Sequence, residues 1–235
     1  MTSNLLEIDG IHTFIGQYHI LQGVTVQIPA GSITALLGRN GAGKTTTLKS
    51  ILGLTPPRQG QILFDGRNIT GMRSFEIASL GIGYVPENRA IFRDLTVAEN
   101  LKIAERRKGD LARRQELIFT LFPDLQRLIQ LPGTHLSGGQ QQMLAIARAL
   151  VADNRLLLID EPTEGLAPVI IEAMMGVIRN LASEITILLV EQNFFVASQL
   201  AEYFAIIEEG RSVKQGRMAD LVGDQATIHR YLEAA

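Results

Sequence analysis

The sequence predicts an α/β fold built around a mostly parallel sheet. Three short apolar runs, at 156–160, 186–190 and 204–207, each have the length of a buried strand, and a helical pattern at 169–181 separates the first two. Strands that are apolar throughout and alternate with helices are typical of a parallel sheet covered on both faces. We therefore expect the C-terminal third of the chain to form such a unit.

Two other segments show different patterns. Between residue 5 and about residue 64, apolar residues such as Val24, Val26 and Ile28 alternate with polar ones, which predicts an antiparallel β-rich part. Between about 88 and 154, apolar residues recur at helical spacing instead. The helical segment is therefore expected to be inserted between two portions of the α/β unit.

Composition excludes several classes of protein. The 235 residues include 22 Lys+Arg and 24 Asp+Glu, and this net charge of −2 argues against a dedicated nucleic-acid binder. A hydrophobic content of 46% is enough for a packed core, and the absence of Cys excludes disulfides and Cys-ligated metals. The start does not read as a signal peptide and no apolar run reaches the roughly 20 residues of a membrane span, so we expect a cytoplasmic location.

A glycine-rich loop follows the apolar run 32–37. Residues 38–45 read GRNGAGKT and match G-x-x-x-x-G-K-[ST], with a predicted strand before them and a predicted helix after them. Glycines let backbone N–H groups turn toward phosphate oxygens, and a helix N-terminus favours the same anion. The pattern predicts an ATP phosphate site formed by Gly38, Arg39, Asn40, Gly41, Ala42, Gly43, Lys44, Thr45 and Thr46.

Two carboxylates complete this predicted site. We expect Lys44 to reach the β- and γ-phosphates and the Thr45 hydroxyl to bind Mg²⁺. The run 156–160 ends in Asp160 and Glu161, and adjacent carboxylates at a strand end normally face a cation or a reacting water, because burying them is costly. We predict that Asp160 joins the Mg²⁺ shell and that Glu161 acts as general base.

A second glycine motif, Leu-Ser-Gly-Gly-Gln at 136–140, begins another predicted helix. Ser137 can cap that helix, and the two glycines expose amides that can hold an anion. With this motif upstream of Asp160, the chain resembles the ABC-type ATPases over essentially its whole length. The resemblance implies that the γ-phosphate of ATP bound to an opposite subunit contacts Ser137, Gly138, Gly139 and Gln140.

The resemblance also implies a domain organisation. The whole chain, 1–235, is similar to a single ABC ATPase domain with a P-loop NTPase (RecA-like) core. Segments 1–87 and 155–235 are expected to form the nucleotide-binding core. Segment 88–154 is expected to form a helical subdomain that ends in the helix of the Ser137 motif.

Three residues depart from the common pattern of the family and indicate which of its subfamilies this chain resembles. Glu87 stands where most members have Gln, Ala167 where they have Asp, and Gln192 where they have a switch His. This trio resembles one of the two ATPase subunits of importers for branched-chain amino acids, or for urea and short amides. It implies that Glu87 offers an oxygen to Mg²⁺ and that Gln192 hydrogen-bonds the γ-phosphate or a water.

The position that should supply an aromatic contact to adenine is also unusual. Family members have an aromatic residue directly before the glycine that is Gly16 here, whereas this chain has Ile15, preceded by Phe14. Ile15 offers only an apolar contact. The sequence alone does not decide whether Ile15 or Phe14 contacts adenine.

The predicted function is ATP hydrolysis that energises an importer, on the inner face of the cell membrane. Implied partners are integral-membrane permease subunits contacted through 84–101, a second ATPase subunit that is either a sister or the same chain, and a separate substrate-binding protein. Nucleic acid is not expected. Alternatives are an ATPase of a lipid-extracting or lipid-exporting ABC system and a soluble ATP-gated clamp on nucleic acid or ribosomes.

Other conspicuous residues have simpler interpretations. The basic cluster 106–108 with 113–114 is interleaved with acids, which favours a solvated helical face over a nucleic-acid patch. The four His residues lack metal-ligand spacing. Phe194 and Phe195 are expected to pack a helix onto the sheet.

Overall fold

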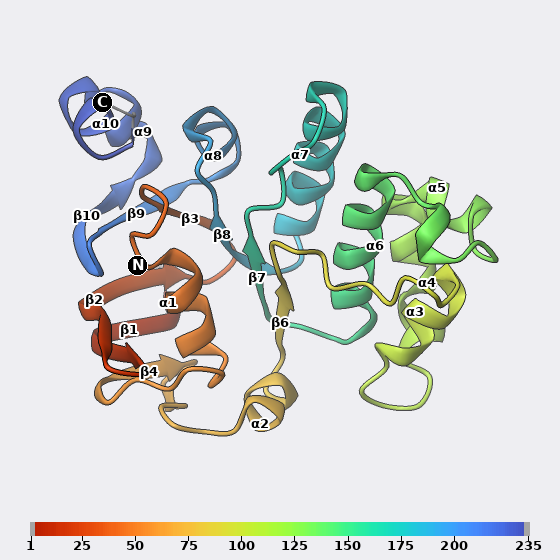
Figure 1. Cartoon of the computed structure of the whole chain (residues 1–235), viewed down its shortest axis with the longest axis horizontal. Helices are drawn as coiled ribbons and strands as arrows, with labels where there is room; N and C mark the ends of the chain where they lie inside the picture. Colours follow the sequence, from red (N-terminus) through yellow and green to blue (C-terminus); the bar gives the residue numbers. More distant parts are fainter. Residues whose placement is uncertain (1–2, 233–235) are drawn as a thin grey trace.

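Two sheets form the framework of the molecule in the computed structural model, which describes residues 3–232 (Figure 1). The larger sheet has six strands in the order β10-β9-β3-β8-β7-β6. Neighbouring strands from β9 to β6 run parallel, and only the β9–β10 pair is antiparallel. The strands are β3 (Ile33–Leu37), β6 (Ile82–Val85), β7 (Leu156–Asp160), β8 (Thr186–Val190), β9 (Tyr203–Glu208) and β10 (Arg211–Arg217).

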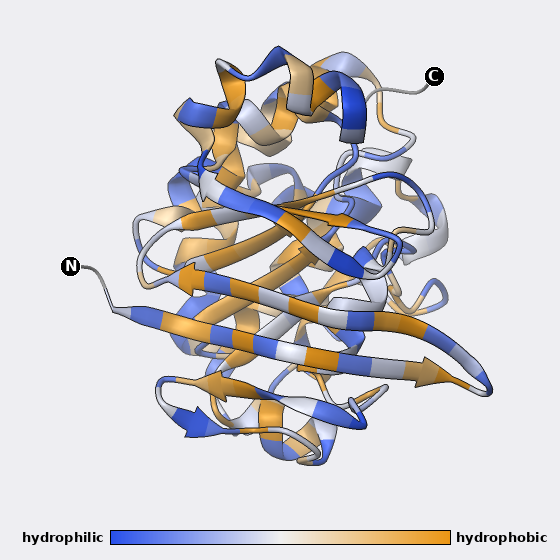
Figure 2. Cartoon of the chain, turned by 90° about the vertical axis from the view of Figure 1, so that its left-hand side faces the viewer, coloured by the Kyte–Doolittle hydropathy of each residue, from blue (hydrophilic) through white to orange (hydrophobic). Residues whose placement is uncertain are grey.

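The smaller sheet is antiparallel, with the strand order β2-β1-β4-β5. Apolar and polar residues alternate along its two long strands, as Figure 2 shows by colour. This alternation buries one face against the core and leaves the other to solvent. The strands are β1 (Asn4–Ile15), β2 (Tyr18–Pro29), β4 (Gln59–Phe64) and β5 (Arg67–Asn68).

Helices fill the remaining space around the central sheet. In Figure 1, α1 lies beside the small sheet, α7 and α8 lie along the central sheet, and α3 to α6 gather on the opposite side of the molecule. The helices of the first half are α1 (Lys44–Ile51), α2 (Ser74–Ser79), α3 (Val97–Ile103), α4 (Asp110–Leu121) and α5 (Pro123–Arg127). Those of the second half are η1 (Gly133–His135, a 3₁₀ turn), α6 (Gly138–Val151), α7 (Pro168–Ala182), α8 (Phe194–Leu200), α9 (Met218–Val222) and α10 (Gln225–Tyr231).

The central strands are apolar throughout because they separate two cores. Leu156 and Leu158 of β7 pack with α1 and the small sheet, whereas Leu157 and Ile159 pack with α6, α7 and α8. All four side chains are fully buried. The predicted α/β fold with an antiparallel β-rich N-terminal part is thus confirmed.

Two details differ from the sequence-based expectations. Phe194 packs against the core, but Phe195 is 63% exposed, so the prediction that both pack a helix onto the sheet is wrong for Phe195. The edge strand β10 was not anticipated, because its residues are mostly polar and exposed. Within residues 3–232, no helix is long and apolar enough to cross a membrane.

Candidate functional site

The glycine-rich loop joins the buried strand β3 to α1, and its backbone requires glycine at two positions. Gly38 has φ +148°, and a Cβ there would lie 2.2 Å from the carbonyl oxygen of Ile207 in β9. Gly43, directly before α1, has φ +111°, and a Cβ would lie 2.7 Å from Leu21 Cδ2. A side chain at Gly38 would therefore displace the backbone of β9, whereas one at Gly43 would adopt a strained backbone and push aside the Leu21 side chain.

Lys44 is the first residue of α1 and lies across the loop. Its side chain is 4% exposed, and Nζ donates to the carbonyl oxygens of Gly38 at 3.0 Å and Arg39 at 3.3 Å. Nζ also pairs with Glu161 Oε1 at 3.2 Å. The structure thus brings together the predicted phosphate-binding lysine and the predicted general base.

Asp160, at the end of β7, is hydrogen-bonded to two neighbouring side chains. The Thr45 hydroxyl donates to Oδ1 at 3.2 Å and the Tyr84 hydroxyl to Oδ2 at 3.3 Å. Burial raises the pKa of Asp160 to about 6, and the charges of Glu161 and Glu87 raise it further against the two hydrogen bonds. Burial and the charge of Asp160 also raise the pKa of Tyr84.

The oxygen donors around Asp160 fit a hard divalent cation such as Mg²⁺. The hydroxyl of Thr45 and the carboxylate of Asp160 lie within hydrogen-bonding distance, and Mg²⁺ is usually held by one or two such groups together with water and phosphates. No cluster of three or more His, Cys, Asp or Glu within the described part of the chain could hold a metal alone. A cation here needs ligands from a nucleotide or water.

Glu161 has an uncommon backbone conformation. Its φ is +45°, in the left-handed region that costs a non-glycine residue about 1–3 kcal/mol. Its backbone N–H donates to the carbonyl of Val190 at 2.9 Å, and its carboxylate turns toward Lys44. Backbone strain of this kind is concentrated at functional sites.

The structure adds Glu191, which sequence reasoning missed. Glu191 is 2% exposed at the end of β8, and its Oε1 accepts a 2.8 Å hydrogen bond from the hydroxyl of Thr163. Burial raises the pKa of Glu191 to about 7, and the nearby charge of Glu161 contributes. Its signal in the sequence was an acid directly after the apolar run 186–190, the same pattern that identified Asp160 and Glu161.

Glu87 and Gln192 lie at the same edge of the sheet. Glu87 follows β6 and is exposed, and its charge acts on Asp160 and Tyr84. Gln192 follows β8 next to Glu191 and is also exposed. Both are placed beside the carboxyl ends of parallel strands, where ligands of open α/β sheets bind.

The motif 136–140 is not brought to this site. Ser137 caps α6 as predicted: its hydroxyl accepts from the N–H of Gln140 at 3.3 Å, and the Gln140 side chain accepts from the N–H of Ser137 at 2.9 Å. In Figure 1, α6 and α1 lie on opposite sides of β7. Within residues 3–232, no hydrogen bond or ion pair joins this motif to the phosphate loop, and Ser137 and Gly138 are exposed.

The hairpin between β1 and β2 separates the two candidates for adenine contact. Phe14 stacks on His19 with ring centroids 4.2 Å apart and is covered by Arg58. Ile15 lies on the other face, shared with Thr13, whose hydroxyl bonds to Ser50 of α1. Tyr18 is paired with Ile15 across the hairpin, so both side chains point to the α1 side, and they are 67% and 49% exposed.

Comparison with known proteins identifies the family. The family model described as ABC transporter matches residues 21–164. The chain belongs to the ABC transporter family. It is 39% identical over 232 residues to BraG, a high-affinity branched-chain amino acid transport ATP-binding protein of Pseudomonas aeruginosa, covering 97% of this chain and 99% of BraG.

Other ABC transporter proteins are similar to this chain in sequence or in fold. LivF of Archaeoglobus fulgidus, a probable branched-chain amino acid transport ATP-binding protein, is 39% identical over 210 residues, 88% of this chain and 89% of LivF. A solved ATP-binding subunit of an ABC transporter superposes with a TM-score of 0.81 at 29% identity, covering 94% of this chain and 93% of that structure. The predicted ABC ATPase identity is confirmed, and with it nucleotide binding and ATPase activity.

The steric requirement at Gly38 can be tested in this ABC ATPase. Gly38→Ala is expected to destabilise the fold by about 3 kcal/mol or more, because the added Cβ meets the Ile207 carbonyl. Gly31→Ala is the matched control: Gly31 also has positive φ, +69°, but nothing lies within 4 Å of a Cβ there, so about 1 kcal/mol is expected. Urea unfolding measures both, and equal losses would refute the steric account.

Glu191 should make stability depend on pH. Its folded pKa, about 7, lies above the ordinary value of 4.5, so the folded state binds the proton more tightly and loses stability as pH rises through 7. Glu191→Gln keeps an acceptor for the Thr163 hydroxyl. In the wild type, the free energy of unfolding should fall between pH 5.5 and pH 8, and this variant should remove about 2 kcal/mol of that fall. Exposed Glu184→Gln is the control. A wild-type pH dependence retained by Glu191→Gln, in unfolding of the nucleotide-free chain, would contradict this assignment.

Proposed function

We propose that this ABC ATPase hydrolyses ATP with Glu161 as general base and thereby energises an importer of branched-chain amino acids or of a related small polar nutrient such as urea. The proposal rests on the placement of Lys44, Glu161 and Asp160 around one glycine-rich loop. Lys44 Nζ lies 3.2 Å from Glu161 Oε1. The choice of cargo is supported by BraG and LivF, both of which are named as branched-chain amino acid transport ATP-binding proteins.

Each side chain of the site has a part in this proposal. The amides of residues 38–46 and Lys44 hold the phosphates of ATP, and the charge of Lys44 moves from Glu161 to the phosphates. Thr45, Asp160 and Glu87 would hold Mg²⁺, which supplies Lewis-acid stabilisation of phosphate charge when bound. Glu161 then accepts a proton from water, and Gln192 hydrogen-bonds the γ-phosphate or that water.

The proposed site is completed by a second ATPase subunit. Ser137, Gly138, Gly139 and Gln140 begin α6, and Ser137 and Gly138 are exposed at this helix N-terminus, which is suited to hold an anion. Within residues 3–232, no hydrogen bond or ion pair joins these four residues to their own phosphate loop. Placing them on the γ-phosphate of an opposite subunit gives this helix N-terminus a ligand. The opposite subunit is either the same chain or a sister ATPase.

The proposed permease contact is the stretch 84–101. Asn100 is fully buried there, and its side chain bonds to the backbone of Phe92 in both directions, at 2.8 and 2.9 Å. Phe92 is held 46% exposed, with the guanidinium of Arg148 4.8 Å from its ring centroid. A rigid, partly apolar surface of this kind suits a protein contact. The permease would hold the ATPase on the inner face of the cell membrane, in a system with a separate substrate-binding protein.

Glu161→Gln tests the general base. The variant should bind ATP normally but hydrolyse it about 10²- to 10⁴-fold more slowly, because a carboxamide cannot accept the proton from water. Glu164→Gln, an exposed acid on the same loop, is the matched control and should retain normal turnover. Phosphate release gives the rate and equilibrium titration gives ATP affinity. Near-normal hydrolysis by Glu161→Gln would refute the assignment.

We also propose that adenine packs on Tyr18 and Ile15. Tyr18→Ala should weaken ATP binding about 5- to 10-fold, the equivalent of one aromatic contact, with kcat little changed. Binding of inorganic tripolyphosphate, which lacks a base, should not change. Phe14→Leu is the control, since Phe14 already stacks on His19. An unchanged ATP affinity in Tyr18→Ala, or an equal loss in Phe14→Leu, would contradict the proposal.

A further inference from the structure

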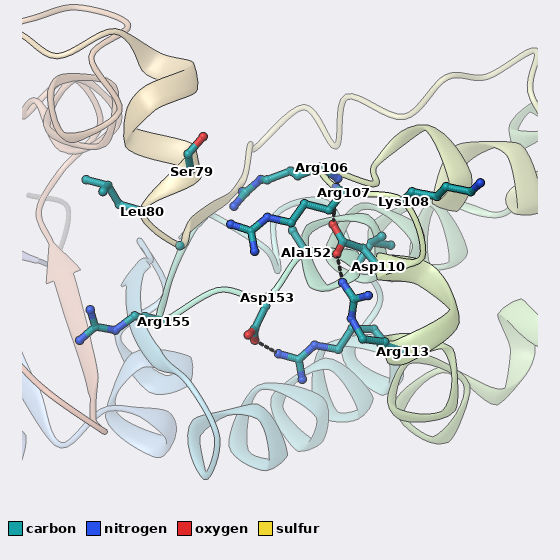
Figure 3. A pocket seen from close by; sticks show the side chains of 13 residues that line it. Ser79, Leu80, Arg106, Arg107, Lys108, Asp110, Arg113, Ala152, Asp153 and Arg155 are labelled. Carbon is teal, nitrogen blue, oxygen red and sulfur yellow. Dashed lines mark hydrogen bonds and ion pairs between the residues drawn. The ribbon is translucent and has the colours of Figure 1, made fainter.

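A strongly basic cavity of about 930 Å³ lies between the central sheet and the helices of segment 88–154 (Figure 3). Its walls come from the end of α2, the loop that leads into α4, the first turn of α4, and the residues between α6 and β7. Two carboxylates, Asp110 and Asp153, line it. The cationic side chains are more numerous: Arg106, Arg107, Lys108, Arg113, Arg114 and Arg155.

Both carboxylates are already paired. Asp110 forms an ion pair with Arg113, which Figure 3 marks with a dashed line. Asp153 forms an ion pair with Arg114. Arg107 and Lys108, by contrast, are not paired with either carboxylate. For these two exposed side chains, no ion pair is formed with any residue in 3–232. Arg155 is also paired, with Asp65 outside the lining at 2.9 Å. The cavity therefore keeps a surplus of positive charge that comes chiefly from Arg107 and Lys108.

The loop that carries these two cations is held in place. The guanidinium of Arg106 donates to the carbonyl of Ala78 at 2.6 Å, to the carbonyl of Ile82 at 3.0 Å and to Asn154 Oδ1 at 2.9 Å. The Asp110 carboxylate accepts the backbone N–H groups of Arg106 at 3.0 Å and Arg107 at 2.7 Å. A loop fixed by such contacts presents its charges with less ordering cost on binding.

The cavity is separate from the ATP site. Arg155 precedes the start of β7, whereas Asp160 is the last residue of that strand, so these two residues are about 16 Å apart at roughly 3.3 Å per residue. No described lining residue belongs to the phosphate loop, to the motif 136–140 or to the proposed permease stretch 84–101. The surplus charge thus has no role in the function proposed above.

We propose that this cavity binds a phosphate-bearing polyanion. Guanidinium groups match phosphate oxygens in charge and hydrogen-bond geometry, and the volume is that of a small-ligand site. Arg107 and Lys108 supply the unpaired cations from the α4 side, while Arg155, which pairs with Asp65 at 2.9 Å, adds positive charge at the sheet side. The phosphates come either from a free polyphosphate or from a phospholipid headgroup.

Binding of inorganic tripolyphosphate by the full chain tests the proposal. A Lys44→Ala background removes the main cation of the phosphate loop, so that the cavity dominates the signal in calorimetry at low salt. Adding Arg107→Glu and Lys108→Glu should lower affinity at least 10-fold. The matched control is Arg67→Glu with Arg73→Glu, two exposed arginines outside the cavity, and it should change affinity less than 2-fold.

Sedimentation with phosphatidylglycerol vesicles distinguishes the two sources of phosphate. Vesicle binding lost only in the cavity variant supports a headgroup ligand, and tripolyphosphate binding lost only in that variant supports a free anion. The proposal is overturned if neither probe binds the Lys44→Ala chain, or if the control variant weakens binding as much as the cavity variant. It is also overturned if the cavity variant loses attachment to permease subunits while binding both probes normally, since the cavity is then a protein contact.

Discussion

The arrangement of the whole site depends on how one buried lysine balances the acids at the ends of β7 and β8. Asp160, Glu161 and Glu191 end two adjacent parallel strands, and Lys44 reaches Glu161 from the first turn of α1. Desolvation and mutual repulsion make such a cluster costly, as the raised pKa values of Asp160, about 6, and Glu191, about 7, show. Nucleotide binding then exchanges partners around Lys44, because the phosphates compete with Glu161 for its charge.

Two backbone features hold Lys44 and Glu161 close together, one at Gly38 and one at Glu161. The parallel pairing of β3 with β9 places Gly38, at the start of the glycine-rich loop, against the carbonyl of Ile207. The left-handed backbone of Glu161 turns its carboxylate toward the loop, while its N–H stays bonded to Val190. The strain at Glu161 is sustained by the parallel pairing of β7 with β8, whose residues are fully buried.

Much of this could be predicted from the sequence because it depends on local patterns. The apolar runs fix the parallel strands, and the cap at Ser137 places the start of α6 at the predicted residue. Contacts between distant segments could not be predicted. The partner of Glu191 is Thr163, 28 positions away, and the choice between Phe14 and Ile15 follows from a hairpin register that brings in Tyr18. The basic cluster 106–108 with 113–114 is mostly exposed, as predicted, but residues 106–108 lie in the loop before α4 and not on a helix. Their place beside a cavity could not be predicted, because it depends on Ala78 and Asn154, which hold Arg106 from other elements.

The most direct test of the account is a crystal structure of the chain with Mg²⁺ and a non-hydrolysable ATP analogue. We predict that Lys44 Nζ leaves Glu161 for the β- and γ-phosphate oxygens, and that the Glu161 carboxylate faces a water beside the γ-phosphate. A structure in which the phosphates occupy the loop while Lys44 remains paired with Glu161 at its present 3.2 Å would contradict it.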